Sequence, residues 1–180
     1  MSTVHIVDLA TGIGTPQAAT LSSRASFAAV RLTDGRVACV GGFGLPASAK
    51  VWGPPASKSS NVAWTWTQLP ATSVERYGSC GSVMSDGRFA VLGGLSNGGY
   101  TLSCEALLVD RDRHWHSLPP MLHARCDFAC AAVARCMIVA GGYGTPSAEV
   151  YDEALNRWIQ LPYKVPGGDA YLRVMGSALL

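Results

Sequence analysis

Three arginines recur at nearly constant spacing, and side chains of this type can recognise anions. Arg24, Arg76 and Arg125 are 52 and 49 residues apart. A planar guanidinium binds a carboxylate through two parallel hydrogen bonds, so these residues could line a site for acidic groups. The alternative is structural, with each guanidinium binding backbone carbonyls that tie neighbouring repeats together. The polar residues within three positions of them, which would share the same surface, are Ser26, Tyr77, Ser79 and Asp127.

Two other pairs have the spacing of reactive sites, and for both we favour a structural interpretation. In a strand, His114 and His116 would face the same side and could bind a metal, but an exposed outer strand explains them as well. Cys126 and Cys130 could form a redox pair if Arg125 stabilised a thiolate, but buried packing is favoured. The sequence has no phosphate loop, nucleophile elbow or metal-ligand spacing. We therefore predict no catalytic residue, no metal and no cofactor.

Charge and hydropathy exclude several classes of protein. The net charge is +2, and no run of lysine or arginine indicates a nucleic-acid or membrane surface. No stretch reaches about 18 consecutive apolar residues, and the N-terminus lacks the pattern of a signal peptide. Charged residues make up 14%, against roughly 25% in average proteins. Sheets that are buried on both faces would account for this low fraction.

The six cysteines indicate a reducing compartment. None forms a CxxC pair or a zinc-ligand spacing, and most lie in apolar runs where a free thiol packs as a small hydrophobe. We therefore expect a cytoplasmic protein, with the nucleus as a second location.

The strongest signal is an internal repeat of about 50 residues. Glycine pairs recur at Gly41, Gly42, Gly93, Gly94, Gly141 and Gly142. Single tryptophans, each followed by Leu-Pro, recur at Trp66, Trp115 and Trp158. The pairs are 52 and 48 residues apart and the tryptophans 49 and 43 apart, in constant order. The glycines would allow chains to approach where a Cβ would clash, and the tryptophans would fill the space between adjacent sheets.

Each repeat contains four short strand patterns. In the second repeat, "CGSVM" and "FAVLGG" flank "SDGR", and an Asp-Gly pair between apolar runs predicts a tight hairpin. The runs "EALLVD" and "HWHSLP" follow. No segment has the apolar periodicity of a helix of ten residues or more. Four strands per repeat is the plan of a propeller blade.

The stretch "AGGYGTPSAEVYDEALNRWIQLP", residues 140–162, resembles the kelch repeat. That family has a Gly-Gly pair ending the second strand, Tyr-Asp in the third, a tryptophan in the fourth, and then Leu-Pro. The resemblance implies an all-β fold, a β-propeller of four-stranded antiparallel blades. In kelch proteins that bind acidic peptides, arginines at the place of Arg24, Arg76 and Arg125 make the contacts.

The chain divides into three full blades with partial blades at both ends. We expect a partial blade at 1–23, blades at 24–75, 76–124 and 125–167, and the first strand of a further blade at 168–180. When these segments are aligned with the third repeat, Asp8 corresponds to Asp152 and Lys50 corresponds to Glu149. An incomplete propeller would expose sheet edges and could self-associate through them.

The resemblance implies a non-enzymatic module that binds another protein or peptide, with an acidic segment favoured. Substrate adaptor and scaffold roles are common in the family. The predicted partner-binding residues are Arg24, Arg76, Tyr77, Ser79, Arg125 and Asp127. One alternative is a galactose oxidase-like enzyme, disfavoured because none of the four histidines falls in an inner strand. Another is a truncated propeller without a function of its own.

Overall fold

The computed structural model describes residues 3–17, 19, 22–54 and 63–164, and these residues form strands and turns only. The predicted first strand of a further blade, at 168–180, lies outside them. The first sheet contains β3 (Ala28–Arg31), β4 (Val37–Val40), β5 (Ala49–Gly53) and β6 (Thr65–Leu69). The second contains β7 (Cys80–Val83), β8 (Phe89–Leu92), β11 (Cys104–Leu107) and β12 (His116–Leu118). The third contains β13 (Ala129–Val133), β14 (Cys136–Ala140), β15 (Ser147–Asp152) and β16 (Arg157–Lys164).

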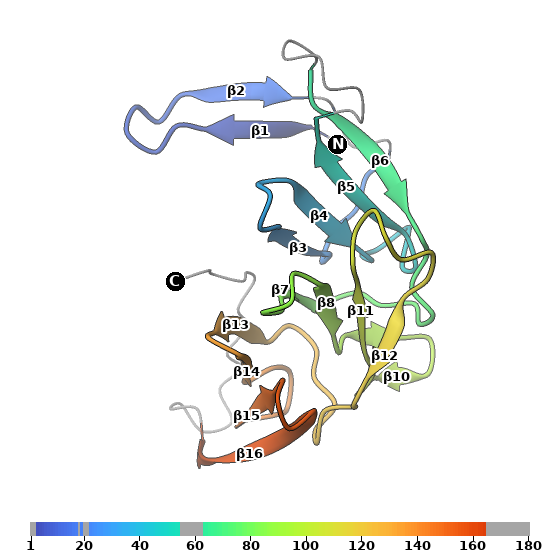
Figure 1. Ribbon diagram of the computed structural model, residues 1–180, viewed down its shortest axis with the longest axis vertical. Helices are drawn as coiled ribbons and strands as arrows, with labels where there is room; N and C mark the ends of the chain where they lie inside the picture. The colour runs from blue at the N-terminus through green and yellow to red at the C-terminus, as the bar shows by residue number, and fades with distance from the viewer. Residues whose placement is uncertain (1–2, 18, 20–21, 55–62, 165–180) are drawn as a thin grey trace.

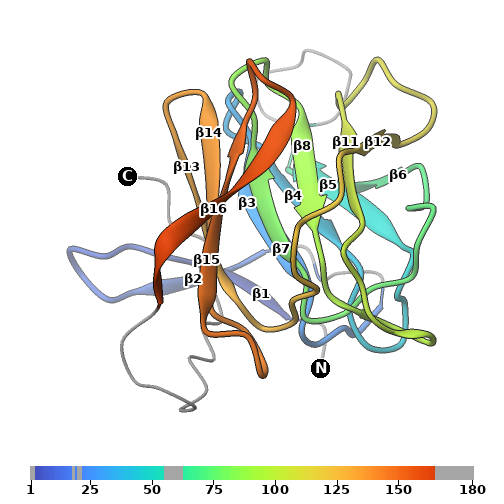
Figure 2. The same ribbon diagram turned by 90° about the horizontal axis from the view of Figure 1, so that it is seen from below.

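Each of the three sheets is an antiparallel meander in chain order, as the repeat predicts. The strands of the three sheets span residues 28–69, 80–118 and 129–164. They are arranged as an open arc whose concave side is formed by the innermost strands β3, β7 and β13 (Figure 1). Seen from below, the three sheets fan out from one another (Figure 2). No described segment forms a helix, so none has the length and apolar character to cross a membrane.

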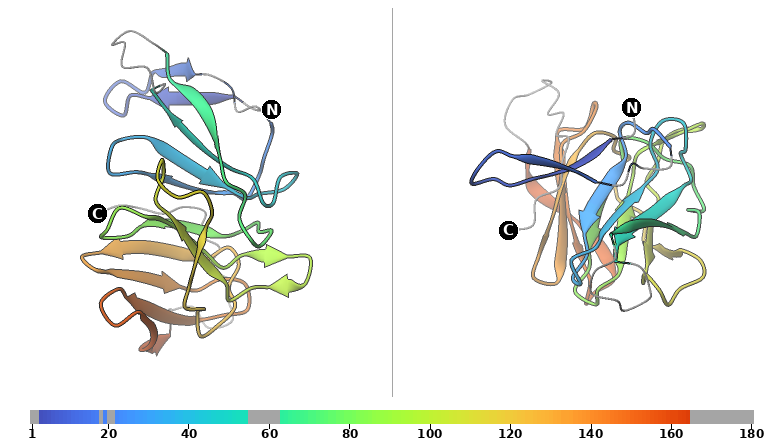
Figure 3. Two further views of the ribbon diagram at one scale, coloured as in Figure 1. Left: turned by 45° about the vertical axis from the view of Figure 1, so that its right-hand side comes forward. Right: turned by 90° about the horizontal axis from the view of Figure 1, so that it is seen from above.

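Two short hairpins lie outside the three sheets. β1 (Val4–Val7) pairs with β2 (Gly14–Gln17), and the hairpin projects beyond the first sheet (Figure 1). In its turn Asp8 accepts the N–H groups of Ala10 and Thr11, just as Asp152 accepts those of the residues two and three positions on. The second hairpin joins β9 (Leu95–Ser96) to β10 (Gly99–Tyr100) and projects from the second sheet (Figure 3). The sequence analysis did not predict this hairpin.

The core lies between the sheets, in two layers. Along β8, Phe89 and Val91 point into the layer shared with the first sheet, whereas Ala90 and Leu92 point into the layer shared with the third. All four are fully buried, because side chains alternate between the faces of a strand that is covered on both sides. The second sheet is therefore the most completely enclosed of the three.

Two of the repeated tryptophans, Trp115 and Trp158, form hydrogen bonds to the preceding repeat. Trp115 is buried and its indole Nε1 donates to the carbonyl of Pro70, 2.9 Å away. Trp158 makes the same bond to Pro119, also at 2.9 Å. The accepting carbonyl belongs in both cases to the Leu-Pro of the preceding repeat. Trp66 departs from the expectation, because its ring is only half-buried beside Trp52.

The glycine pairs lie where successive repeats touch. Gly41 has a φ of +72°, and a Cβ on it would lie 2.2 Å from the carbonyl oxygen of Arg76 in the next repeat. The amide of Gly42 donates to that same oxygen at 3.0 Å, and Gly94 donates to Arg125 at 2.8 Å. Both requirements, a left-handed backbone and the absence of a Cβ, favour glycine here.

Candidate functional site

The loops that follow the glycine pairs come out at one end of the three sheets. We call this end the loop face, defined by residues 24–26, 41–48, 75–79, 93–103, 123–127 and 141–147. A line of backbone hydrogen bonds crosses it, from the amide of Gly78 to Ser26 (2.7 Å) and from the amide of Asp127 to Gly78 (2.8 Å). All three residues have positive φ. The loop face is therefore a continuous surface that spans all three repeats.

Arg76 and Arg125 reach the loop face with their backbones only, since neither side chain has any exposed surface. The guanidinium of Arg125 donates to the carbonyls of Gly141 and Ser147, both at 2.7 Å, and forms an ion pair with Glu149 at 2.8 Å. Arg76 makes the equivalent contacts and an ion pair with Glu105. This contradicts our expectation that these two arginines contact a partner.

The buried arginines have the structural role that was the alternative, with one difference. The carbonyls they bind belong to their own repeat, and it is the backbone carbonyls of Arg76 and Arg125 that accept amides of the preceding repeat. The paired glutamates extend the link to the preceding loop. Glu105 accepts the amide of Ser73 at 2.9 Å, and Glu149 accepts the amide of Leu122 at 2.7 Å.

The first repeat lacks this ion pair. Arg24 is half-buried and binds the carbonyls of Gly41 and Ser48 at 3.2 and 3.3 Å, like its counterparts. The place of the glutamate is taken by Lys50, which is only 5% exposed. Its described hydrogen bond is to Ser22 Oγ at 3.3 Å, and within the described ranges no carboxylate lies within 4 Å of its Nζ. The first repeat therefore holds two cations where the others hold a balanced pair.

The other predicted site residues have separate places on the loop face. Ser79 is half-buried, and its Oγ has no hydrogen-bond partner within the described part of the chain. Asp127 is half-buried in the line of backbone bonds. Tyr77 lines a pocket, and is the predicted residue that the structure brings into one.

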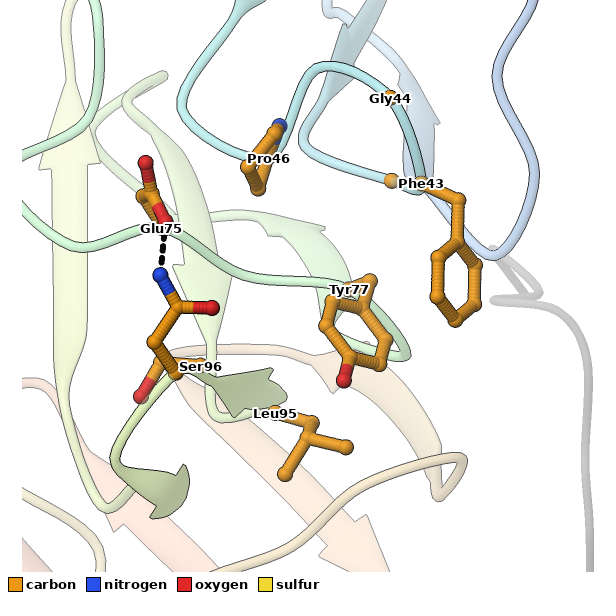
Figure 4. Close-up of a pocket in the computed structure, with 9 residues that line it drawn as sticks. Phe43, Gly44, Pro46, Glu75, Tyr77, Leu95 and Ser96 are labelled. Atoms are coloured by element: carbon orange, nitrogen blue, oxygen red, sulfur yellow. Dashed lines mark hydrogen bonds between the residues drawn. The ribbon is translucent and has the colours of Figure 1, made fainter.

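This pocket opens between the first and second repeats and has a volume of about 90 Å³ (Figure 4). The loop after β4 supplies Phe43 and Pro46, the second repeat supplies Tyr77 and Leu95, and Glu75 lies at the end of the first repeat. The rings of Phe43 and Tyr77 lie 4.3 Å apart. On the other wall, Asn97 donates to the carboxylate of Glu75 at 3.0 Å. Sequence reasoning missed all of these except Tyr77, although Phe43 directly follows a glycine pair.

A second aromatic pair lies between the second and third repeats. Tyr100 of β10 and Tyr143 of the loop after β14 have ring centroids 5.8 Å apart. Tyr143 follows the Gly-Gly pair as Phe43 does, so the two rings are repeats of one position. These three rings are 45%, 41% and 56% exposed for Tyr100, Tyr143 and Phe43, which is high for aromatic side chains.

The candidate reactive pairs do not form reactive sites in the described structure. The rings of His114 and His116 lie 4.6 Å apart, but His114 lies before β12, and no cluster of three possible metal ligands occurs within the described ranges. Burial, followed by the charge of Asp127, raises the pKa of the Cys126 thiol to about 12. This supports the packing interpretation of Cys126, and Arg125 pairs with Glu149 rather than with a thiolate.

Cys130 forms a disulfide with Cys80, whereas the sequence analysis favoured buried packing of Cys130 and indicated a reducing compartment. The two residues are 50 positions apart on the innermost strands of the second and third sheets. Cys80 pairs with Leu92 and Cys130 with Val139, one step apart in register, so they point to opposite faces of equivalent strands and meet between the sheets. Cys80 and Cys130 are 50 residues apart, whereas Arg76 and Arg125 are 49 apart, and this difference of one residue is a signal in the sequence that we did not use.

Comparison with known proteins agrees with the repeat and the fold. An F-box/kelch-repeat protein of Arabidopsis thaliana is 41% identical over 56 aligned residues, which cover 28% of this chain and 15% of that protein. The solved structure of YjhT superposes with a TM-score of 0.71 at 14% identity, over 87% of this chain and 57% of that one. No family model matches the chain. The chain thus corresponds to part of the length of each relative.

Four-stranded meanders fanned around their innermost strands define the described part of the chain as an arc of a β-propeller. Its glycine pairs, and the tryptophans that bind the preceding Leu-Pro, resemble the kelch repeat, and the partial match to an F-box/kelch-repeat protein agrees with that resemblance. The all-β fold and the kelch resemblance predicted from the sequence are confirmed.

Proposed function

We propose that this propeller segment binds an extended segment of another protein across its loop face and has no catalytic activity. The observation that carries the proposal is the row of exposed rings, Phe43, Tyr100 and Tyr143, on one face of a rigid sheet framework. Aromatic side chains are enriched at the centre of protein interfaces, and exposed apolar patches mark such surfaces. A substrate adaptor or a scaffold would use this face to hold its target.

The test is selection of binding peptides from a display library by the immobilised full chain. A double variant, Phe43→Ala with Tyr143→Ala, removes two exposed rings from the loop face. A matched control, Val133→Ala with Leu155→Ala, removes two exposed apolar side chains from the end of β13 and from the β15–β16 turn, at the opposite end of the third sheet. We expect the loop-face variant to bind the selected peptides at least about 10-fold more weakly, as for interface hot spots, and the control to bind them normally.

Unfolding curves of both variants show whether the fold is intact. Equal binding by the two double variants, or stronger loss in the control, would contradict the proposal. So would selection that enriches no peptide over an unrelated β-propeller used as bait.

A further inference from the structure

The pocket between the first and second repeats has a defined chemical character, and the inference below rests on the proposed function. Its apolar wall consists of the Phe43 and Tyr77 rings, with Leu95 and Pro46 beside them. Phe43 is 56% exposed, so one ring is open to solvent. The π faces of aromatic rings are electronegative and attract cations.

The one charged group of the pocket lining is the carboxylate of Glu75. Glu75 is exposed and binds Asn97, and within the described ranges it has no ion pair. The neighbouring Arg76 cannot neutralise it, because its guanidinium is buried against Glu105. A ligand in this pocket therefore meets two aromatic rings and an uncompensated negative charge (Figure 4).

The size of the pocket limits what it can hold. Its volume of about 90 Å³ is well below the roughly 300–1,000 Å³ of sites for whole small molecules. The space suits the end of one side chain that enters from a longer segment lying across the loop face. A basic side chain satisfies both walls, because its methylene stem packs on rings while its charged end reaches the carboxylate.

We propose that this pocket takes a basic side chain of the bound protein segment, with arginine fitting better than lysine. A guanidinium stacks on an aromatic face and donates two parallel hydrogen bonds to a carboxylate, which an ammonium group cannot do. For this pocket, a basic side chain takes the place of the acidic segment that the spacing of the arginines led us to expect. With Arg76 and Arg125 buried, the described charge that remains in the pocket is negative.

The first test uses single residues as probes and needs no known partner. The α-N-acetyl amide of arginine is titrated into the full chain while amide resonances are followed by NMR. The acetyl amides of norleucine and glutamate serve as neutral and acidic controls. We expect saturable shifts at Phe43, Gly44, Tyr77 and Asn97 with the arginine probe and at least about 5-fold weaker binding of both controls.

Two isosteric variants separate the local charge from the overall charge. Glu75→Gln keeps the acceptor for Asn97 but removes the charge, and should weaken the arginine probe about 5-fold. Asp86→Asn removes a carboxylate from the β7–β8 turn, at the other end of the second sheet, and should leave binding unchanged. Equal affinity in both variants, or norleucine binding as tightly as arginine, would overturn the proposal.

The display selection distinguishes failure of this inference from failure of the proposed function. Peptides that bind through the loop face but lack arginine and lysine would overturn the pocket assignment and leave the interaction function standing. Binding of the arginine probe that depends on Glu75, without any selected peptide, would support the pocket and contradict the wider function. Enriched peptides whose affinity falls when their arginine is replaced, in the wild type but not in Glu75→Gln, would support both.

Discussion

The guanidinium of Arg125 and the carboxylate of Glu149 lie 2.8 Å apart with neither side chain exposed, and together they link β15 to the loops that follow β14 and precede β13. Removing one member of a buried pair leaves an uncompensated charge, which typically costs about 3–5 kcal/mol. Glu149→Ala should therefore lower the free energy of unfolding by about that amount in urea denaturation. Asp86→Asn, in the half-exposed pair with Arg88, should change it by less than about 1 kcal/mol. Comparable losses in the two variants would show that burial does not strengthen the pair.

At Lys50 a glutamate can be introduced rather than removed, because Lys50 occupies the position at which the other two repeats have the glutamate. Lys50→Glu would supply the missing carboxylate to Arg24 and should raise the free energy of unfolding by about 1–3 kcal/mol, the range for hydrogen bonds to charged groups. Glu105→Lys, which copies the first repeat into the second, should lower it. Thermal unfolding of the two single variants gives the signs directly. A folded Lys50→Glu variant that is less stable than the wild type would contradict the equivalence of the repeats.

The tryptophans differ in what they stabilise. Trp115→Ala empties a buried position and removes the bond to Pro70, so we expect a loss of about 3–5 kcal/mol. Trp66→Ala should cost clearly less, because that ring is half-buried. Urea unfolding followed by circular dichroism keeps the measurement independent of the fluorescence that each variant loses. An equal cost at both positions would mean that Trp66 is covered in solution.

The cysteines can be counted chemically. Four of them are free and two form the disulfide, so unfolded protein without reductant should show four reactive thiols and six after reduction. Six thiols before reduction would show that the bond is absent, as expected for a reducing compartment. Cys80→Ser with Cys130→Ser should lower stability by about 2–4 kcal/mol in oxidised protein and leave reduced protein nearly unchanged.

The buried thiols also predict a response to alkaline pH. Burial raises the pKa values of Cys104 and Cys126 from 9.0 to about 12. Folding thus favours the protonated thiols, and the stability they contribute is complete below pH 9 and is lost as the pH rises through 12. Urea denaturation at a series of pH values should show this decline. Replacing Cys104 by alanine should reduce its slope, and an unaltered slope would assign the decline to other groups.

The repeat in the sequence was sufficient to predict the sheets, because glycine pairs, Asp-Gly turns and tryptophans each impose a local geometry. The candidate site was harder to predict. Arg76 lies in the loop before β7, and its burial depends on Glu105, 29 residues away, which accepts a hydrogen bond from its guanidinium. The pocket needed contacts between repeats: Phe43 meets Tyr77 only once the two sheets are packed, and the β9–β10 hairpin interrupts the repeat. Side chains that occur in one repeat only, such as Glu75 and Asn97, cannot be predicted from the periodicity of the sequence.

The side chains of β8 pack alternately against the first and the third sheet. The second sheet is therefore the middle unit of three, and each of its two interfaces is with an adjacent sheet. In such linear arrays the outer units open first and the enclosed unit opens last. Amide hydrogen exchange should then proceed inward from both ends, with Phe89–Leu92 exchanging most slowly. A ligand bound between the first and second repeats would stabilise the interface between them. Binding at the loop face should therefore slow amide exchange in strands that do not contact the ligand.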